Sequence, residues 1–420
     1  MQNKRYVIVG ASAAGMAAAE AIGGCDPHGS ICMLSQEADI PYFRPMIPLI
    51  VSRRKKIAEI SLQDRGPYRS QHQQIDLQLN TRVVRVDPAA RQVHTAGGAV
   101  TAYDRLLIAT GSRPVMPPPQ TPGLETEGVL TLRTLADARK MDERAGRSQH
   151  AVVLGAGLLG LKAAMALLQR GLAVTLVEKE AEILPWLMEA DAAVRIRRAL
   201  EDAGVTIIQN TTVQAVQGDS RGVGAVVLDT GRELACQLLC IGIGVQPNID
   251  CMEGSGIRVD GGVVTDAYTA CSAPHVYAAG DAAVTFDAIS GQPVVTGLWT
   301  NAVEMGRCAG ANMAGRPSVY GGTFGILNAT QVAGLPFVAM GVVHTAGTAF
   351  QTHIHSTRET YRKLVFSAKG DRLVGALFIG AIAKAGLYRA VIQQGLKIDG
   401  IRKPLMAHRL HYGDLLCARR

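Results

Sequence analysis

The sequence predicts an α/β protein in which one parallel-sheet domain is inserted into another, followed by a smaller α+β domain. Two glycine-bearing turns, about 145 residues apart, indicate this arrangement, because each follows an apolar strand and precedes a helix and a second strand. The 420 residues suffice for two or three domains with cores of their own. Hydrophobic residues make up 48% of the chain and glycine contributes 46 residues, which is typical of α/β layers joined by tight turns.

The first turn, Gly10–Gly15, follows the apolar strand Tyr6–Val9, and the second turn, Gly155–Gly160, follows Ala151–Leu154. A strand that ends in a glycine turn and continues as a helix presents free backbone N–H groups at the positive end of that helix, where a pyrophosphate can bind. The two turns therefore predict two Rossmann-like dinucleotide-binding domains. Two dinucleotides on one chain indicate hydride transfer from a nicotinamide to a flavin.

The other elements are expected from short apolar runs and from the prolines and glycines between them. In chain order they are short strands over 83–102 around the Gly97-Gly98 turn, a buried strand Leu106–Ala109, a proline-rich crossover Pro114–Pro122, a second strand–helix–strand pattern over 148–178, a helix and a strand over 190–209, short strands over 223–241, a crossover Ile241–Pro247, a strand His275–Ala278, a helix Leu298–Met313, and strands followed by helix over 320–420.

The two crossovers divide the chain into three predicted domains. Residues 1–114 and 243–318 form the first nucleotide domain, which is discontinuous. Residues 115–242 form the second nucleotide domain, which is inserted into the first. Residues 319–420 form the C-terminal α+β domain.

The residue after the second strand of each nucleotide domain selects the nucleotide, because a carboxylate there accepts hydrogen bonds from ribose hydroxyls. In the inserted domain this residue is Glu178, and no arginine cluster follows it. A carboxylate at this place favours NADH and repels the 2′-phosphate of NADPH. In the first domain the candidate is Glu37, although Gln36 can occupy the same place, and Ser12 stands where the middle glycine of the turn is usual.

The composition excludes several other classes of protein. Aromatic residues are 5% of the chain, too few for a surface that stacks nucleic-acid bases, and no uninterrupted apolar stretch is long enough for a membrane helix. The first strand follows Met1–Arg5 directly, without room for a signal peptide, and the eight cysteines show neither CxxC nor zinc spacing. We therefore expect a reduced, cytoplasmic protein without a metal site or an integral membrane segment.

The net charge of +8 is unevenly distributed along the chain. Residues 320–420 contain 13 Lys and Arg against 4 Asp and Glu, whereas residues 1–319 contain 30 against 31. Such an excess is either an ordinary solvated surface or a docking face for an acidic partner, whose encounter a field of one sign accelerates.

Further segments resemble the two-dinucleotide-fold flavoproteins of the pyridine nucleotide–disulfide oxidoreductase superfamily. Tyr103–Pro114 is similar to the family's ATG segment, Gly242–Asn248 to its GxxPN segment, and Tyr277–Asp281 to the segment whose aspartate binds the flavin ribityl chain. The resemblance covers nearly the whole chain. It implies that the first nucleotide domain holds FAD, that the second holds NADH in preference to NADPH, and that the last domain is the family's C-terminal domain.

The resemblance and the turns together imply two sets of cofactor-binding residues. The FAD set is Gly10, Ser12, Ala13, Ala14, Gly15, Glu37, Arg44, Pro45, Ala109, Thr110, Gly111, Arg113, Gly280, Asp281, Leu298 and Trp299. The NAD set is Gly155, Gly157, Leu158, Leu159, Gly160, Glu178, Gly242 and Gly244. By the same analogy the helix that starts near Leu298 directs its N-terminal N–H groups at the flavin, although Trp299 can equally be a packing residue.

The branch of the family is indicated by missing cysteines. Disulfide reductases carry a CxxxxC motif after the first strand–helix–strand unit, and single-cysteine branches place a cysteine in the segment that is here Pro41–Pro48, which has none. The PY-x-RP pattern of this segment instead resembles NADH-dependent rubredoxin and ferredoxin reductases and the flavin module of nitrite reductase. This implies electron transfer, without a thiol relay, to a separate acidic carrier of the rubredoxin or iron–sulfur type.

The same resemblance and the charge distribution locate the partner. The carrier is expected to dock on the basic C-terminal domain, to which the run Arg53–Lys56 adds positive charge. The assembly is expected to be a monomer or a homodimer. Other acceptors stay open at this point: O2 or small molecules, as in NADH oxidases and diaphorases; quinone at a membrane surface; or no acceptor at all, as in flavin redox sensors related to apoptosis-inducing factor.

One position departs from the ferredoxin-reductase pattern. That branch usually carries a Lys soon after the RP and a Glu after the second glycine turn, and here these positions are Leu49 and Lys162. The resemblance implies that Lys162 is a catalytic cation beside the flavin. At ~4 Å and an effective dielectric constant of ~20, it would stabilise the anionic reduced form by about 4 kcal/mol before desolvation. The alternative is that Lys162 points to solvent from the first turn of its helix.

Overall fold

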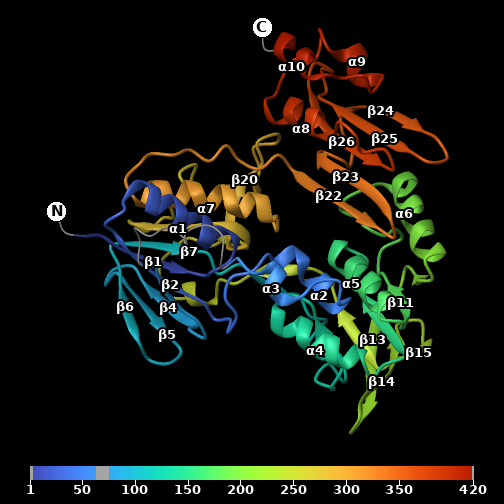
Figure 1. Ribbon diagram of the computed structural model, residues 1–420, viewed down its shortest axis with the longest axis horizontal. Coiled ribbons are helices and arrows are strands. Elements are labelled where there is room, and N and C mark those ends of the chain that lie inside the picture. The colour runs from blue at the N-terminus through green and yellow to red at the C-terminus, as the bar shows by residue number, and fades with distance from the viewer. Residues whose placement is uncertain (1–2, 63–74, 419–420) are drawn as a thin grey trace. The chain divides into compact units, whose positions relative to one another are not determined.

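The structure, a computed structural model, describes residues 3–62 and 75–418 and divides into two compact units (Figure 1). The first unit is built from Met1–Val115, Thr131–Asp142 and Gly244–Thr323. The second unit is built from Met116–Leu130, Glu143–Ile243 and Phe324–Arg420. Most of 115–242 thus shares a compact unit with the C-terminal residues, and the division into three domains stays a prediction.

A five-stranded parallel sheet organises the first unit. Its order is β19 (Val276–Ala278), β7 (Arg105–Ile108), β1 (Arg5–Val9), β2 (Ser30–Leu34) and β3 (Ile75–Gln78). Every residue of β1 after Arg5 is buried, as expected for a central strand covered on both faces. Val9 pairs with Leu34 on one side and with Ile108 on the other, so the turns after these three strands share one edge of the sheet.

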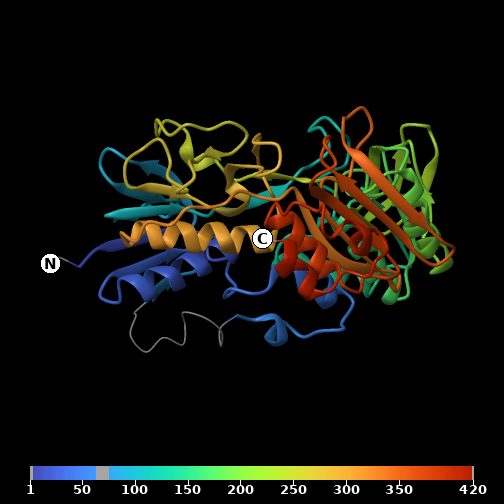
Figure 2. The ribbon, with the colours of Figure 1, turned by 90° about the horizontal axis from the view of Figure 1, so that it is seen from above.

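Helices α1 (Ala13–Cys25) and α7 (Trp299–Met313) lie side by side in the first unit (Figure 2). They approach closely because glycine faces alanine: a Cβ on Gly306 would lie 2.2 Å from Ala14 O, and one on Gly310 would lie 2.4 Å from Ala18 O. Both pairs advance by four residues, so the helices run parallel. Because Ala14 is near the start of α1 and Gly306 is in the middle of α7, the first turns of α7 extend ~9 Å beyond the start of α1.

The remaining elements of the first unit are short. They are the helical turns η1 (Arg44–Met46), α2 (Ile47–Val51), α3 (Ile57–Ile60), η3 (Asp250–Met252) and η4 (Gly280–Ala282), and the strands β4 (Val83–Asp87), β5 (Gln92–Thr95), β6 (Val100–Ala102), β8 (Ser112–Pro114), β17 (Val245–Pro247), β18 (Val263–Val264), β20 (Ala283–Phe286) and β21 (Pro293–Val294). The chain first leaves the unit after β8 and returns for the last time before β17, and these two strands pair with each other. The pairing holds the two crossings together.

The second unit contains another five-stranded sheet. Its order is β12 (Thr206–Ile208), β11 (Ala173–Val177), β10 (His150–Leu154), β16 (Leu238–Ile241) and β9 (Val129–Thr131), and the pairs among the first four strands are parallel. Helix α5 (Leu158–Gln169) follows β10 and α6 (Ala190–Asp202) follows β11. Helix α4 (Leu135–Ala145), which precedes β10 in the chain, belongs to the first unit up to Asp142. The antiparallel strands are β13 (Val213–Asp219), β14 (Gly222–Leu228) and β15 (Glu233–Ala235). Each glycine turn follows a strand and is followed by a helix and a second strand, and the predicted α/β class is confirmed.

The C-terminal residues of the second unit form an antiparallel sheet followed by helices, in the predicted order. The sheet runs β22 (Ile326–Val332), β23 (Leu335–Gly341), β26 (Leu373–Ile379), β25 (Tyr361–Phe366) and β24 (Gln351–Ser356). The helices are α8 (Ala385–Gln393), α9 (Arg402–Met406) and α10 (Tyr412–Ala418). Strand β26 is almost fully buried, whereas the edge strand β24 is largely exposed.

An ion pair between a buried lysine and a half-buried glutamate joins this C-terminal sheet to the nucleotide-domain part of the same unit. Lys363 on β25 is 1% exposed, and its Nζ donates hydrogen bonds to Glu189 Oε2 at 2.6 Å, to Val343 O at 2.9 Å and to Thr345 Oγ1 at 2.9 Å. Glu189, the N-cap of α6, also accepts a hydrogen bond from the Thr345 N–H. Each charged group therefore has partners, which is the condition under which a buried pair is tolerated.

Three further observations concern what the described residues do not contain. No described helix combines the length and the apolar character needed to cross a membrane. Among the same residues, no cluster of His, Cys, Asp and Glu is arranged to hold a metal ion. The seven cysteines whose side chains the structure describes form no disulfides.

We expect Glu189→Gln to destabilise the second unit at neutral pH and to do so less in acid. Although burial opposes ionisation, the hydrogen bonds from Lys363 and Thr345 hold the pKa of Glu189 below its ordinary value. A carboxylate with a depressed folded pKa stabilises the protein above its unfolded pKa and loses this contribution as the pH falls through the folded pKa. Urea unfolding followed by circular dichroism should show a loss on the order of 3 kcal/mol at neutral pH.

The matched control is Glu201→Gln, which changes an exposed carboxylate on the same helix and should alter stability by less than about 0.5 kcal/mol. The loss caused by Glu189→Gln should shrink once the pH drops below about 4. A loss of equal size in neutral and acidic buffer would contradict the assignment of this stabilisation to the ion pair.

Candidate nucleotide-binding sites

The first turn requires glycine at both of its ends. Gly10 adopts a φ of +116°, and a Cβ on it would lie 2.0 Å from Ala109 O, just after β7. A Cβ on Gly15 would lie 1.9 Å from Gly10 O. Strands β1 and β7 and helix α1 can therefore approach one another only because these two positions lack side chains.

The start of α1 has polar groups left over for a ligand. Ser12 is the N-cap residue, but its side chain makes no capping hydrogen bond. Its carbonyl accepts the hydrogen bond from the Met16 N–H at 2.9 Å, which leaves the N–H groups of Ala13, Ala14 and Gly15 without intrahelical partners. One hydroxyl and three N–H groups at the positive end of a helix fit the pyrophosphate of FAD.

Glu37 lies after β2 and is held by two side chains. Its carboxylate accepts a hydrogen bond from Tyr42 Oη and another from Arg44 Nη2, each at 2.5 Å. Burial and the nearby Glu37, against the opposing charge of Arg44, raise the pKa of Tyr42, which therefore stays a hydrogen-bond donor. Gln36, the alternative ribose ligand, is exposed, whereas Glu37 is half-buried.

Arg44 connects Glu37 to Asp281 through a chain of hydrogen bonds. Arg44 Nη1 donates to Arg133 O at 2.7 Å. Arg133 Nη2 donates to Asp281 Oδ2 and to Ser112 Oγ, each at 2.8 Å, and Ser112 Oγ donates to Asp281 Oδ2 at 2.7 Å. We call these five residues, together with Tyr42, the carboxylate–arginine network. It brings the predicted ribose ligand and the predicted ribityl ligand into one connected cluster within the first unit.

The ATG segment is cross-linked to the residues where the chain returns to the first unit. Thr110 Oγ1 donates to Asn248 O at 2.6 Å, and Asn248 Nδ2 donates to Thr110 O at 3.1 Å. The N–H of Asn248 bonds to Gly111 O at 2.9 Å. Gly280, with a φ of +74°, lies against Ala14, where a Cβ on Gly280 would come within 3.2 Å of the alanine side chain. The ends of β7 and β19 therefore meet the start of α1.

The other predicted FAD residues lie at the margins of this cluster. Arg113 is half-exposed and pairs with Asp250 at 2.6 Å. Leu298 is the N-cap of α7 and makes no side-chain capping bond. The Trp299 ring packs edge-on against the Phe43 ring, with centroids 4.8 Å apart, so Trp299 has at least a packing role.

The second turn repeats the construction of the first. Gly155 has a φ of +103°, and a Cβ on it would lie 2.5 Å from Gly242 O, just after β16. A Cβ on Gly160 would lie 1.9 Å from Gly155 O. Gly157 differs from both, because no atom lies within 4 Å of its Cβ position. The space in front of Gly157 is therefore open, as close approach of a pyrophosphate requires.

Glu178 is fixed beside the second turn. It is 8% exposed, its Oε2 accepts a hydrogen bond from the Ala156 N–H at 2.5 Å, and its Oε1 accepts one from the Glu180 N–H at 3.0 Å. Leu158 and Leu159 form the first turn of α5, next to the same loop. The carboxylate thus lies at the carboxyl end of β11, beside the turn that is expected to hold NADH.

Two predicted residues lie apart from this second cluster. Gly244, with a φ of +129°, belongs to the first unit, where its carbonyl accepts a hydrogen bond from the Val115 N–H. Lys162 is the fifth residue of α5 in the second unit, whereas Leu49 is part of α2 in the first. Lys162 is half-buried and has no hydrogen-bond or ion-pair partner among the described residues, and burial lowers its pKa.

Sequence reasoning missed three members of the carboxylate–arginine network: Tyr42, Ser112 and Arg133. Tyr42 belongs to the PY-x-RP pattern, as does Pro45 in the first turn of η1. This pattern could therefore have indicated Tyr42 as a site residue. Ser112 lies within the ATG segment but was not singled out. Arg133 lies in no motif, and its side-chain partners are 21 and 148 residues away, so no local pattern pointed to it.

Three described thiols of the first unit, those of Cys32, Cys251 and Cys271, are poorly suited to a redox relay. Burial, with a contribution from Asp76, raises the pKa of Cys32 to about 11. Burial likewise raises the pKa of Cys251 to about 11 and that of Cys271 to about 12. Because the thiolate is the reactive form, these three cysteines are weak nucleophiles near neutral pH.

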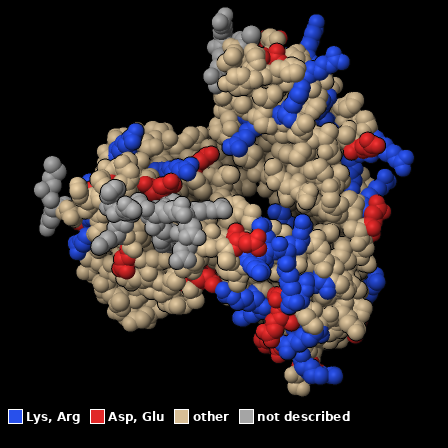
Figure 3. All heavy atoms as spheres, in the orientation of Figure 1, with Lys and Arg blue, Asp and Glu red and all other residues tan. Residues whose placement is uncertain are grey.

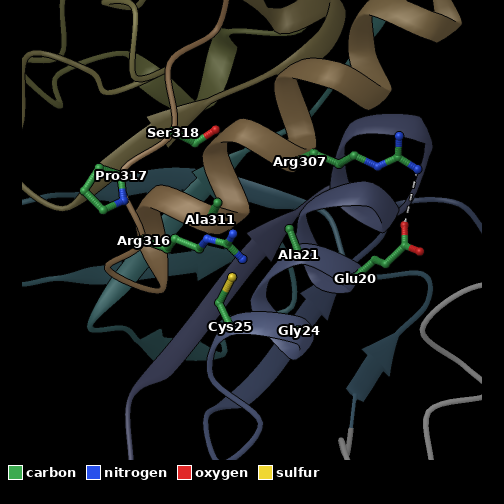
Figure 4. A pocket seen from close by; sticks show the side chains of 9 residues that line it. All are labelled: Glu20, Ala21, Gly24, Cys25, Arg307, Ala311, Arg316, Pro317 and Ser318. Carbon is green, nitrogen blue, oxygen red and sulfur yellow. Dashed lines mark ion pairs between the residues drawn. The ribbon is translucent and has the colours of Figure 1, made fainter.

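A surface pocket of about 430 Å³ lies at the opposite end of α1 from the glycine turn (Figure 4). Arg307 and Glu20 pair there at 3.7 Å. Because α1 has 13 residues, its two ends are ~20 Å apart, and this pocket is separate from the dinucleotide site. Its lining residues are Glu20, Ala21, Gly24, Cys25, Arg307, Ala311, Arg316, Pro317 and Ser318.

Comparison with known proteins agrees with this geometry. Residues 4–306 match the family model described as pyridine nucleotide-disulphide oxidoreductase. Subunit epsilon of the NADH-dependent phenylglyoxylate dehydrogenase of Aromatoleum evansii is 29% identical over 98% of this chain and 97% of that protein. Rubredoxin-NAD(+) reductase of Pseudomonas putida is 30% identical over 74% of this chain and 80% of that protein.

A solved structure shows the same fold. The ferredoxin reductase for the CYP199A2 system of Rhodopseudomonas palustris matches with a TM-score of 0.84 at 25% identity, over 93% of this chain and 95% of that one. Other curated relatives are longer, and the chain spans about half the length of two of them. The two glycine turns and the match over 4–306 lead to one conclusion: the chain belongs to the pyridine nucleotide-disulphide oxidoreductase family and is an FAD-dependent NAD(P)H oxidoreductase.

Proposed function

We propose that this chain passes electrons from NADH, through FAD, to a separate carrier of the rubredoxin or ferredoxin type without a thiol relay. The observation that carries the proposal is the chemistry of the carboxylate–arginine network. Its side chains are carboxylates, guanidinium groups and hydroxyls, and the segment Pro41–Pro48, which supplies Tyr42 and Arg44, contains no cysteine. The similarity to rubredoxin and ferredoxin reductases supports the same class of acceptor.

The first unit would hold FAD with groups that still have bonding capacity. When bound, FAD supplies the step from a two-electron hydride donor to a one-electron acceptor. Ser12 Oγ and the N–H groups at the start of α1 would bind its pyrophosphate. Glu37 and Asp281 would accept hydrogen bonds from its ribose and ribityl hydroxyls, because a carboxylate has about four acceptor sites and their arginine and hydroxyl partners leave some of these free.

The second unit would select NADH. Glu178 is already held by the Ala156 and Glu180 N–H groups, so its carboxylate is oriented before any nucleotide binds. An oriented carboxylate accepts hydrogen bonds from the ribose hydroxyls of NADH and repels the 2′-phosphate of NADPH. The open space at Gly157 would admit the pyrophosphate.

Gly157→Val should abolish tight NADH binding while leaving the fold intact. No atom lies within 4 Å of the Gly157 Cβ position and its φ is −72°, so the branched side chain is accommodated in the free protein but occupies the pyrophosphate space. We expect the Michaelis constant for NADH to rise at least tenfold, with FAD content and unfolding midpoint unchanged. Unchanged NADH kinetics would remove Gly157 from the site, and a lowered unfolding midpoint would contradict the open geometry.

Glu178→Arg should shift the preference toward NADPH. The ratio of kcat/KM for NADH to that for NADPH is expected to fall at least tenfold, because the repulsion of the 2′-phosphate is replaced by attraction. Glu180→Arg is the matched control, since it places the same charge on an exposed side chain two residues away and keeps the N–H that bonds to Glu178. An equal effect of both variants would show that only the overall charge matters.

Lys162 is proposed as the cation that stabilises the reduced flavin. Its amine is half-buried and has no ion-pair partner among the described residues, so its charge can interact with a bound ligand. Lys162→Met should lower the midpoint potential of the bound flavin, measured by anaerobic titration with a reference dye. Arg170→Met, which removes a cation at the far end of α5, is the control, and equal potentials in Lys162→Met and the unaltered protein would remove Lys162 from the site.

The acceptor is tested by anaerobic reduction with NADH followed by stopped-flow mixing with a rubredoxin, with a [2Fe–2S] ferredoxin, or with air-saturated buffer. We expect reoxidation by at least one carrier to be faster than reoxidation by O2. Rapid reoxidation by air with none by either carrier would identify an oxidase instead. Activity lost after alkylation of a single cysteine would contradict the absence of a thiol relay.

A second candidate follows from one comparison. The chain and the epsilon subunit of phenylglyoxylate dehydrogenase match over nearly their full lengths. By this likeness, the chain would be the NAD-linked subunit of a larger enzyme, and its acceptor or donor would be a partner subunit rather than a diffusing carrier. Purification of the tagged chain from its own host, with stoichiometric partner subunits that exchange electrons with it, would favour this candidate.

A further inference from the structure

We propose that the electron carrier docks on a basic surface of the first unit, rather than on the C-terminal sheet and helices. This surface, which we call the α2–α4 basic surface, consists of Arg53, Arg54 and Lys56 after α2 and of Arg139 and Lys140 on α4. The inference rests on the proposed function, because it names where the acidic carrier of that function binds.

The two segments of this surface are tied together by an ion pair. Arg53 Nε donates to Asp142 Oδ1 on α4 at 3.0 Å. Arg139 pairs with Asp39, and Lys55, which is half-buried, pairs with Glu59. Figure 3 shows Lys and Arg side chains, with Asp and Glu side chains among them, over the region where Figure 1 labels α2, α3 and α4. The loop and the helix therefore form one continuous patch.

The patch keeps an excess of positive charge after its own pairs are counted. Asp142 is bonded to Arg53 and Asp39 to Arg139, whereas Glu59 is bonded to the neighbouring Lys55 and the exposed Glu143 on α4 pairs with Arg147. Arg54, Lys56 and Lys140 are exposed and form no ion pair within the described parts of the chain. Three uncompensated cations on one face favour an acidic protein surface and would steer its approach.

The same two segments directly follow, along the chain, residues of the expected flavin site. Helix α2 directly follows η1, which begins at Arg44, the partner of Glu37. Helix α4 begins two residues after Arg133, the partner of Asp281. Since electrons cross only short distances between redox centres, a carrier must dock close to the flavin. The α2–α4 basic surface meets this need within one compact unit.

The basic C-terminal residues are a weaker docking face than their number indicates. Lys363 is buried in its pair with Glu189. The half-buried Arg362 and Arg402 donate to Met406 O and Gly370 O, whereas Arg372, which donates to Gly395 O, stays exposed. Part of the sequence's positive excess therefore stabilises the C-terminal block and is not presented to a partner.

The overall reaction on this surface transfers two electrons from NADH to two carriers. Each NADH oxidised to NAD+ reduces two one-electron carriers and releases one proton. The carriers bind one after the other to the same surface, so the rate of each encounter should fall as salt screens the patch.

The test reverses three charges on the proposed surface with the variant Arg54→Glu/Lys56→Glu/Lys140→Glu. The matched control, Lys369→Glu/Lys397→Glu/Lys403→Glu, reverses three exposed cations of the C-terminal block. Reduction of an acidic rubredoxin and of an acidic [2Fe–2S] ferredoxin is measured over a range of ionic strength, and binding of each carrier to the oxidised protein is measured by calorimetry. Menadione, a small uncharged acceptor, reports the half-reaction with NADH.

We expect the surface variant to lose at least tenfold in kcat/KM for the carrier, to bind it more weakly, and to show little salt dependence. Its FAD content and menadione turnover should be unchanged, and the C-terminal variant should lose less than twofold. A larger loss in the C-terminal variant, or no loss in the surface variant, would overturn the docking site alone.

If the unaltered protein reduces neither carrier, the proposed function itself fails, and the docking site falls with it. The unaltered protein is also mixed with vesicles containing phosphatidylglycerol. If it binds them, and the surface variant loses this binding while its carrier reduction is unaffected, the patch serves a membrane surface. That result would also overturn the inference. The menadione rate separates both outcomes from a damaged flavin site.

Discussion

The construction of both sites depends on one steric constraint: a strand, the helix after it and the end of a neighbouring strand meet where no side chain fits. In each turn the last glycine faces the carbonyl of the first, with a Cβ position 1.9 Å from that oxygen, and the first glycine faces the carbonyl at the end of a neighbouring strand. Close contact of these backbones leaves the helix N-terminus at the carboxyl edge of the sheet, where ligands of open α/β sheets bind. The two turns differ at the middle position, which is Ser12 in one and Gly157 in the other, and at the two residues that follow it.

Charge in the first unit is arranged around this edge. Two carboxylates, Glu37 and Asp281, are each bonded to an arginine, and the two arginines are joined through the Arg133 carbonyl. Such bonding orients partly buried carboxylates without using all of their acceptor capacity. The elements that follow these arginines, α2 and α4, carry cations outward to the surface, so the expected cofactor site and the proposed docking face are parts of one framework.

Much of the fold was predictable because its elements depend on local patterns. The strand expected over Tyr6–Val9 is β1, the helix expected over Leu298–Met313 is α7, and the short strands around Gly97-Gly98 are β5 and β6. The glycine turns were visible for the same reason, since both the strand and the turn are encoded within a few neighbouring residues. Interactions between distant segments were not visible: the bonds of Arg133 to Asp281 and of Lys363 to Glu189 span 148 and 174 residues.

By itself the sequence determined the two strand–turn–helix units, the carboxylates placed after their second strands, and the absence of cysteine from Pro41–Pro48, because each of these is a property of contiguous residues. Only the tertiary structure decided which charges are available. Counting charges along the chain places the positive excess in the C-terminal block. Folding buries Lys363 there and gives Arg362 and Arg402 internal partners, but it leaves Lys369, Lys397 and Lys403 exposed, as it does the shorter run near Arg54. The physical reason is that a charge acts on a partner only from the surface, and burial is set by packing between segments that the sequence does not place side by side.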